Sequence, residues 1–129
     1  GSEALIKKGA KRVLPLQVHG AFHSGLMQPA KEKLKPFIDE AVLSKGHAKV
    51  AMNTPGDFVE ACPQMKTHLV NQVTNPVRWH RAVRAIDTYG VDHFIELGCG
   101  KTLAGMNKRL GLQAPTLSVE KIEDITLLE

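Results

Sequence analysis

The sequence contains few cysteines and few aromatic residues, and it has no long apolar run. Cys62 and Cys99 are the only cysteines in 129 residues. They are too few for a disulfide framework and too far apart for a Cys-x-x-Cys site, so both are expected to be free thiols in a reducing compartment. Because the chain lacks both an apolar run of about 20 residues and a signal-peptide pattern, we expect a soluble, cytoplasmic protein that does not enter a membrane.

The charge is modestly positive. Seventeen Lys and Arg against 13 Asp and Glu give a net charge of +4 at pH 7, which favours an acidic partner but is well below that of a dedicated nucleic-acid binder. A hydrophobic content of 43% suits one globular domain or part of a larger one. The chain starts with Gly1-Ser2, the scar that removal of an expression tag leaves, so we expect a piece of a longer protein.

Strand and helix patterns alternate along the chain. Strands are predicted at 12–18, 48–52, 94–97 and 115–119, and helices at 3–8, 29–45, 63–73, 76–89, 102–110 and the C-terminus. Pro36 lies inside the second helix and is expected to kink it. Strands that alternate with helices and are joined by short loops predict a parallel α/β sheet.

The segment from residue 94 to 110 is a strand, a glycine-rich turn and a helix, which is the topology of a phosphate site. Its residues do not fit either nucleotide motif. A Walker A loop needs glycine at position 95, where the chain has Ile95, and the dinucleotide fingerprint needs a third glycine at Leu103. We favour a structural turn and keep nucleotide binding as a weaker alternative.

Other motifs are also unconvincing. His19 and His23 are four residues apart, but the Gly-Ala-Phe between them is not a helix and lacks the glutamate of a zinc protease pair, so no metal site is predicted. No pattern places two carboxylates together. Trp79 with its neighbouring arginines is interpreted as a core residue beside a solvated face, because one aromatic residue offers no stacking platform for nucleic acid.

His23 is the polar residue whose setting most favours catalysis. It follows a predicted strand end within a glycine-flanked loop, where the catalytic groups of parallel sheets gather. A solvated loop histidine is the alternative. A general base also needs a nucleophile, and none of Ser24, Ser44 and Ser118 has the Gly-x-Ser-x-Gly pattern of a nucleophile elbow.

Four segments together are more specific than any of these motifs. They are residues 9–16 (GAKRVLPL), 21–30 (AFHSGLMQPA), 71–79 (NQVTNPVRW) and 96–110 (ELGCGKTLAGMNKRL). In order and spacing these segments resemble the C-terminal portion of the malonyl-CoA:acyl carrier protein transacylase family. The resemblance covers nearly the whole chain. Cys99 replaces the family's usual proline in the Gly-Pro-Gly turn, which is a structural segment.

The resemblance implies a serine enzyme that moves a malonyl group from coenzyme A to the thiol of acyl carrier protein in fatty acid synthesis, through an acyl-serine ester. It implies that His23 is the general base and that the backbone carbonyl of Gln72 orients the imidazole. A serine hydroxyl needs such a base because it is a weak nucleophile at neutral pH. Coenzyme A thioester is a substrate, so no cofactor is expected.

Three further residues acquire expected roles from the resemblance. Phe22 matches the malonyl-type form of the motif, in contrast to the methylmalonyl type, where a smaller residue leaves room for a methyl group. Lys11 and Arg12 are candidates to face the phosphates of coenzyme A or the acidic carrier protein, with a solvated strand end as the alternative.

The resemblance also implies boundaries. Residues 1–2 are a tag scar, 3–18 the last helix and strand of a small ferredoxin-like subdomain, and 19–129 the C-terminal part of an α/β-hydrolase-like large subdomain. The family's nucleophile elbow, oxyanion loop and malonate-binding arginine precede this chain, so we expect it to be inactive alone and to self-associate through exposed sheet edge. The alternative function is a non-catalytic module that docks an acidic carrier protein through Arg78, Arg81 and Arg84.

Overall fold

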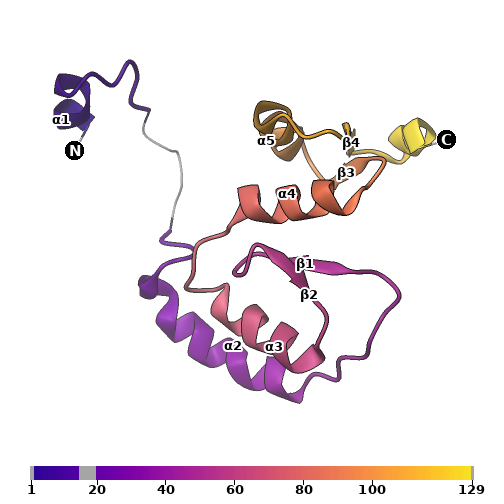
Figure 1. Cartoon of the computed structure of the whole chain (residues 1–129). Helices are drawn as coiled ribbons and strands as arrows, with labels where there is room; N and C mark the ends of the chain where they lie inside the picture. The colour runs from indigo at the N-terminus through magenta and orange to yellow at the C-terminus, as the bar shows by residue number, and fades with distance from the viewer. Residues whose placement is uncertain (1, 15–19, 129) are drawn as a thin grey trace.

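The computed structural model describes residues 2–14 and 20–128. Figure 1 shows α1 apart from the other elements, with α2 and α3 side by side and α4 between the two pairs of strands. In chain order the elements are α1 (Ser2–Lys7), η1 (Gly25–Met27), α2 (Gln28–Glu40), β1 (Val50–Met52), β2 (Asp57–Val59), α3 (Cys62–Asn71), α4 (Trp79–Tyr89), β3 (Phe94–Leu97), α5 (Thr102–Leu110), β4 (Thr116–Val119) and η2 (Ile122–Leu128).

The fold is α/β, with helices flanking two separate pairs of strands. β3 and β4 are parallel, in a register that pairs Phe94 with Thr116 and Leu97 with Val119. A parallel pair needs a crossover, and α5 provides it. β1 and β2 are antiparallel and form a hairpin. The parallel sheet predicted from the sequence is therefore limited to β3 and β4 among the described residues.

The core lies between the hairpin and the helices on either side of it. Its buried apolar side chains come from both strands of the hairpin and from α3 and α4, and they are Met52, Val59, Val70, Ala82 and Val83. α4 packs against both strands of the hairpin, and α2 packs against α3. Val83 is only 1% exposed, so α4 is anchored at its middle by the removal of this side chain from water.

Proline and glycine delimit several helices as the sequence predicts. Pro29 and Pro63 lie in the first turns of α2 and α3, where the absent N–H breaks no helical bond. Gly90 and Gly111 end α4 and α5 in the left-handed conformation, which glycine adopts without a Cβ penalty. The predicted helix at 102–110 matches α5.

Two predicted elements near the N-terminal end of the chain are wrong in part. Residues 12–14 are irregular and not part of a strand, and the rest of the predicted strand, 15–18, lies outside the described residues. The helix predicted to reach residue 45 ends at Glu40 instead, because Ala41 takes an extended conformation with ψ of 133°. Val42 is consequently 95% exposed.

Two further differences lie around the hairpin. The residues after the turn at 53–56 pair back on β1 as β2, a strand that was not predicted from the sequence. α4 starts at Trp79 and not at Pro76. Asn75 does not cap α4, because its backbone N–H and side-chain amide both donate to the carbonyl of Asn71, at 3.1 and 2.8 Å. The predicted C-terminal helix is a 3-10 helix.

Large apolar side chains remain exposed on several elements, β3 and α2 among them. Ile95 and Leu97, which alternate along β3 and share one face, are 49% and 76% exposed, and Phe37 on α2 is 72% exposed. Side chains of this kind are normally scattered singly on a soluble domain. The described residues therefore leave one face of β3 uncovered.

Gly56, in the hairpin turn, should be difficult to replace by a residue that has a side chain. Its φ is 62°, and an added Cβ would lie 2.8 Å from the Cβ atoms of both Arg78 and Arg81 and 3.0 Å from the Arg78 carbonyl oxygen. We expect Gly56→Ala to destabilise the chain by about 1–3 kcal/mol from the strained backbone alone, with the clash adding to this, as measured by urea unfolding.

Gly46→Ala is the matched control, because nothing lies within 4 Å of the Cβ position there and φ is not positive. Equal midpoints for the two variants would contradict the close packing of the hairpin turn on the start of α4.

Candidate active site around His23

The loop before α2 holds His23 in an unusual backbone conformation. His23 has φ of 57°, which is in the left-handed region that residues other than glycine rarely adopt. Ser24 fixes the next step of the chain, because its hydroxyl donates to the Ala21 carbonyl at 2.6 Å and accepts from the Leu26 N–H at 3.3 Å. The strained residue is thus followed by a capped turn of 3-10 helix, a pattern often found at functional sites.

The imidazole of His23 is bonded to the end of α3. Its Nδ1 lies 2.7 Å from the backbone carbonyl oxygen of Gln72, a residue 49 positions away in the sequence. A carbonyl can only accept a hydrogen bond, so Nδ1 carries the proton and donates it. In the neutral ring the lone pair is therefore on Nε2, which leaves that nitrogen as the basic atom.

The Gln72 carbonyl is available because of the way α3 ends. Gln72 is the C-cap residue of α3, and its N–H donates to the His68 carbonyl at 2.9 Å. The next backbone donors, from Thr74 and Asn75, both go to Asn71, at 3.2 and 3.1 Å. The carbonyl that His23 uses is thus one of the orphan acceptors of a helix C-terminus. This end of a helix carries partial negative charge.

Side chains from two other elements hold the end of α3. Lys31 on α2 donates to the Asn71 side chain, and Asn53 in the hairpin turn donates to the Gln72 side chain, both at 2.9 Å. The Thr54 hydroxyl is 2.9 Å from Nδ1 of His68. The sequence indicated no role for Asn53, since one asparagine carries no signal of what its side chain contacts.

The other candidate residues lie at different distances from His23. Phe22 is its neighbour in the chain, is 68% exposed, and lies so close to Gly20 that a Cβ there would be 2.9 Å from the phenyl ring. Lys11 and Arg12 are exposed and follow α1, in the part of the chain that Figure 1 draws apart from α2 and α3. The described structure brings together His23, Gln72 and Phe22, and does not bring Lys11 or Arg12 to them.

The glycine turn after β3 is occupied by a carboxylate of the chain itself. Glu96 accepts hydrogen bonds from the N–H groups of Leu103 and Ala104, both at 2.9 Å, and from the Ser118 hydroxyl at 3.2 Å. The backbone N–H groups of Ala104 and Leu103 hold the pKa of Glu96 below its usual value. A phosphate would need the same donors and would meet this negative charge, which argues against the nucleotide-binding alternative.

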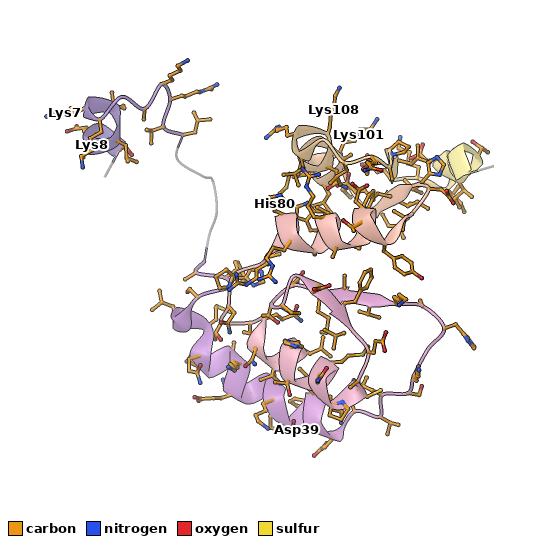
Figure 2. All side chains as sticks on the ribbon, in the orientation of Figure 1. Lys7, Lys8, Asp39, His80, Lys101 and Lys108 are labelled. Carbon is orange, nitrogen blue, oxygen red and sulfur yellow. The ribbon has the colours of Figure 1, made fainter. Side chains whose placement is uncertain are left out.

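Cations are concentrated on α4 and at the start and end of α5. Arg78, Arg81 and Arg84 are exposed as predicted, although Arg84 also donates to the Leu110 carbonyl. Figure 2 shows His80 on α4 and Lys101 and Lys108 at the ends of α5. Trp79 is half-buried, and its Nε1 donates to the buried Asn107 at 3.2 Å. This supports the interpretation of Trp79 as a packing residue.

Residues 2–14 and 20–128 lack two further kinds of functional feature. No helix there is long and apolar enough to cross a bilayer. The same residues contain no group of three His, Cys, Asp or Glu side chains that could hold a metal ion.

Two curated proteins are similar in sequence to nearly the whole chain. It is 37% identical over 126 residues to the malonyl CoA-acyl carrier protein transacylase of Bacillus subtilis and 33% identical over 117 residues to that of Staphylococcus aureus. The homologues of this chain are malonyl CoA-acyl carrier protein transacylases. The matches cover 98% and 91% of the chain but only 40% and 38% of the two transacylases, so the chain spans about two fifths of their length. No protein-family model matches it.

Solved transacylase structures share the fold. The chain aligns with MCAT from Streptococcus pneumoniae with a TM-score of 0.87 and 32% identity, and with the acyl-carrier-protein S-malonyltransferase of Burkholderia pseudomallei with a TM-score of 0.86 and 36% identity. Each alignment covers 98% of the chain and 41% of the solved structure. A third, with a TM-score of 0.86 and 32% identity, is a malonyl-transacylase in complex with a type II PKS acyl-carrier protein.

The bonds to Glu96 should make stability depend on pH. Because the folded-state pKa is lowered, the contribution of Glu96 is present above its unfolded pKa and is lost as pH falls through its folded pKa. We expect Glu96→Gln to lower stability at pH 7 and to flatten the fall of stability below about pH 4.5, in urea unfolding measured across the acid range.

Some acid sensitivity should remain in Glu96→Gln, because backbone N–H groups of Lys121 and Glu120 lower the pKa of Asp124 in the same way. Glu40→Gln, a change on the exposed end of α2, is the control and should leave the slope as it is. A Glu96→Gln chain with an unchanged slope would refute this role of the carboxylate.

Proposed function

We propose that this chain supplies the general base of a malonyl-CoA:acyl carrier protein transacylase, which transfers a malonyl group from coenzyme A to the carrier thiol for fatty acid synthesis in the cytoplasm. The observation that carries the proposal is the hydrogen bond from His23 Nδ1–H to the Gln72 carbonyl. It leaves Nε2 as the basic atom of the neutral ring. His23 and Gln72 are the proposed base and backbone orienter.

The proposed reaction uses Nε2 of His23 twice in each half. Nε2 takes the proton of a serine hydroxyl while the serine oxygen bonds to the thioester carbonyl carbon, and it returns the proton to the coenzyme A sulfur when the carbon–sulfur bond breaks. In the second half Nε2 takes the proton of the carrier thiol. The thiol sulfur then bonds to the acyl carbon of the serine ester, and the proton returns to the serine oxygen as the carbon–oxygen bond breaks.

The nucleophile is proposed to come from the part of the transacylases that this chain does not span. Ser24 is next to His23 in the sequence, but its hydroxyl is used in the turn before η1. Among the described residues the only hydrogen-bond partner of the His23 ring is the Gln72 carbonyl. The resemblance to transacylases, which use a serine, supports an incoming hydroxyl at Nε2.

Substrate contacts extend the same proposal. Phe22, which is held over Gly20, is proposed to limit the acyl group to malonyl by filling the space that a methyl branch needs. Lys11 and Arg12 are proposed to contact the phosphates of coenzyme A or the acidic carrier protein. Both residues are exposed, as such a contact requires. Coenzyme A thioester is the substrate and no cofactor is proposed.

The carrier protein is the proposed macromolecular partner, and a basic hollow on α4 and α5 is a candidate contact for it. The hollow is lined by the apolar residues Trp79, Met106 and Leu110 and by His80 and Arg109. A relative has been solved in complex with an acyl-carrier protein. An acidic partner with apolar anchors would complement this surface.

Removal of His23 should abolish transfer in the complete transacylase that contains this chain. We expect His23→Ala to lower kcat for malonyl transfer by about 10³-fold or more, by analogy with base removal in serine hydrolases. The 129-residue chain by itself should transfer nothing, since it would lack a nucleophile and an oxyanion hole.

His47→Ala is the matched control, because this histidine is exposed on the loop before β1, and it should retain the parent rate. A complete enzyme that works at full rate without His23, or measurable transfer by the chain alone, would remove the proposed mechanism.

The carrier contact can be tested separately from the chemistry. We expect Arg109→Glu, a change in the lining of the hollow, to raise KM for the carrier protein by about tenfold at low salt, with little change in the rate of loading from malonyl-CoA. The effect should fade at high salt because exposed charges are screened.

Lys45→Glu makes the same change of charge on the exposed loop before β1 and should leave KM near the parent value. An equal effect of both substitutions would show that only the net charge matters, and no effect of Arg109→Glu would exclude this face.

A further inference from the structure

One residue of the hairpin turn is bonded to both ends of the loop that follows α3. The Asn53 side-chain amide donates to Oε1 of Gln72 at 2.9 Å, and the Asn53 backbone carbonyl accepts from the N–H of Arg78 at 3.0 Å. Gln72 is the first residue after α3 and Arg78 the last before α4. The whole segment 72–78 therefore lies between two hydrogen bonds to the same residue.

The position of this segment determines where the His23 ring can bond. The ring reaches Gln72 through the backbone carbonyl, while Asn53 reaches the side chain of the same residue. A carbonyl at a helix end can rotate as the last turn frays, because no helical N–H holds it. The bond from Asn53 fixes the residue that carries this carbonyl, and the contact is partly buried, where hydrogen bonds are less open to competition from water.

Asn53 is itself held in a defined place. It follows β1, the Gly56 N–H closes the turn on the Met52 carbonyl at 2.9 Å, and the adjacent Thr54 hydroxyl is bonded to His68 one turn earlier in α3. The close approach of Gly56 to Arg78 and Arg81 joins the same turn to the start of α4. The hairpin turn is thus a rigid support with contacts to both helices.

We propose that Asn53 is a positioning residue for the general base: it fixes Gln72 so that the Gln72 carbonyl keeps the proton on Nδ1 of His23 and the lone pair on Nε2. The catalytic consequence rests on the function proposed above, whereas the effect on the ring does not. Asn53 touches neither His23 nor, in the proposed reaction, the reacting atoms. It acts through one side-chain bond.

The first test reads the imidazole directly. Nitrogen-15 NMR of the chain, labelled at histidine, should show His23 predominantly protonated at Nδ1 when the ring is neutral. Asn53→Ala should raise the fraction protonated at Nε2. Thr54→Val is the matched control, because it removes the neighbouring bond to His68 and loosens the same contact between the turn and α3 without touching Gln72. It should leave the His23 tautomer unchanged.

The second test uses the complete transacylase and a double-mutant cycle. Asn53→Ala and Gln72→Ala each delete one partner of the same bond while keeping both backbone carbonyls, so each should lower kcat on the order of tenfold with KM for malonyl-CoA unchanged. The double variant should lose no more than either single variant, because the two residues act as one unit.

The outcomes separate this inference from the proposed function. An unchanged His23 tautomer and an unchanged kcat in Asn53→Ala would overturn the positioning role, as would a double variant whose loss is the product of the two single losses. If the complete protein transferred no malonyl group, the proposed function would fail, and the tautomer comparison would still decide whether Asn53 orients His23.

Discussion

The hydrogen bond between the His23 ring and the Gln72 carbonyl joins two parts of the chain that are 49 residues apart, and the candidate site depends on it. The ring comes from a loop in a strained left-handed conformation, and the carbonyl comes from the end of α3. Neither element alone defines a site. Their meeting turns an exposed histidine into one whose two nitrogens differ, because a carbonyl accepts only from a protonated nitrogen.

The rest of the described fold brings these two elements together. α2 begins directly after the His23 loop and packs along α3, and Lys31 joins the two helices at the level of Asn71. The hairpin packs on α4 and holds the end of α3 through its turn. Burial of Met52, Val59, Val70 and Val83 stabilises this arrangement, so the orientation of the base depends on a small apolar core.

Local signals explain which parts of the fold could be predicted from the sequence. The limits of α5 followed from its flanking glycines and its helical period, and the start of α2 from Pro29. The end of α2 and the strand β2 were missed, and the start of α4 could not be predicted because a long-range bond accompanies it. The N–H of Arg78, for example, bonds to Asn53, 25 residues away, and this contact has no local signature.

The candidate site likewise has residues that could be predicted from the sequence and residues that could not. The motif around His23 suggested a base from its position in the chain, but its partner Gln72 was accessible only through resemblance to transacylases, since a backbone carbonyl leaves no trace in residue type. Asn53 is one step further removed, because it contacts a residue that contacts the base. Conversely, Glu96 shows how a motif can mislead. The glycine turn has the topology of an anion site, yet its donors are already used by a carboxylate seven and eight positions before them. Whether a helix N-terminus can bind a ligand therefore depends on whether a side chain of the protein already accepts hydrogen bonds from its N–H groups. A glycine pattern alone does not indicate this.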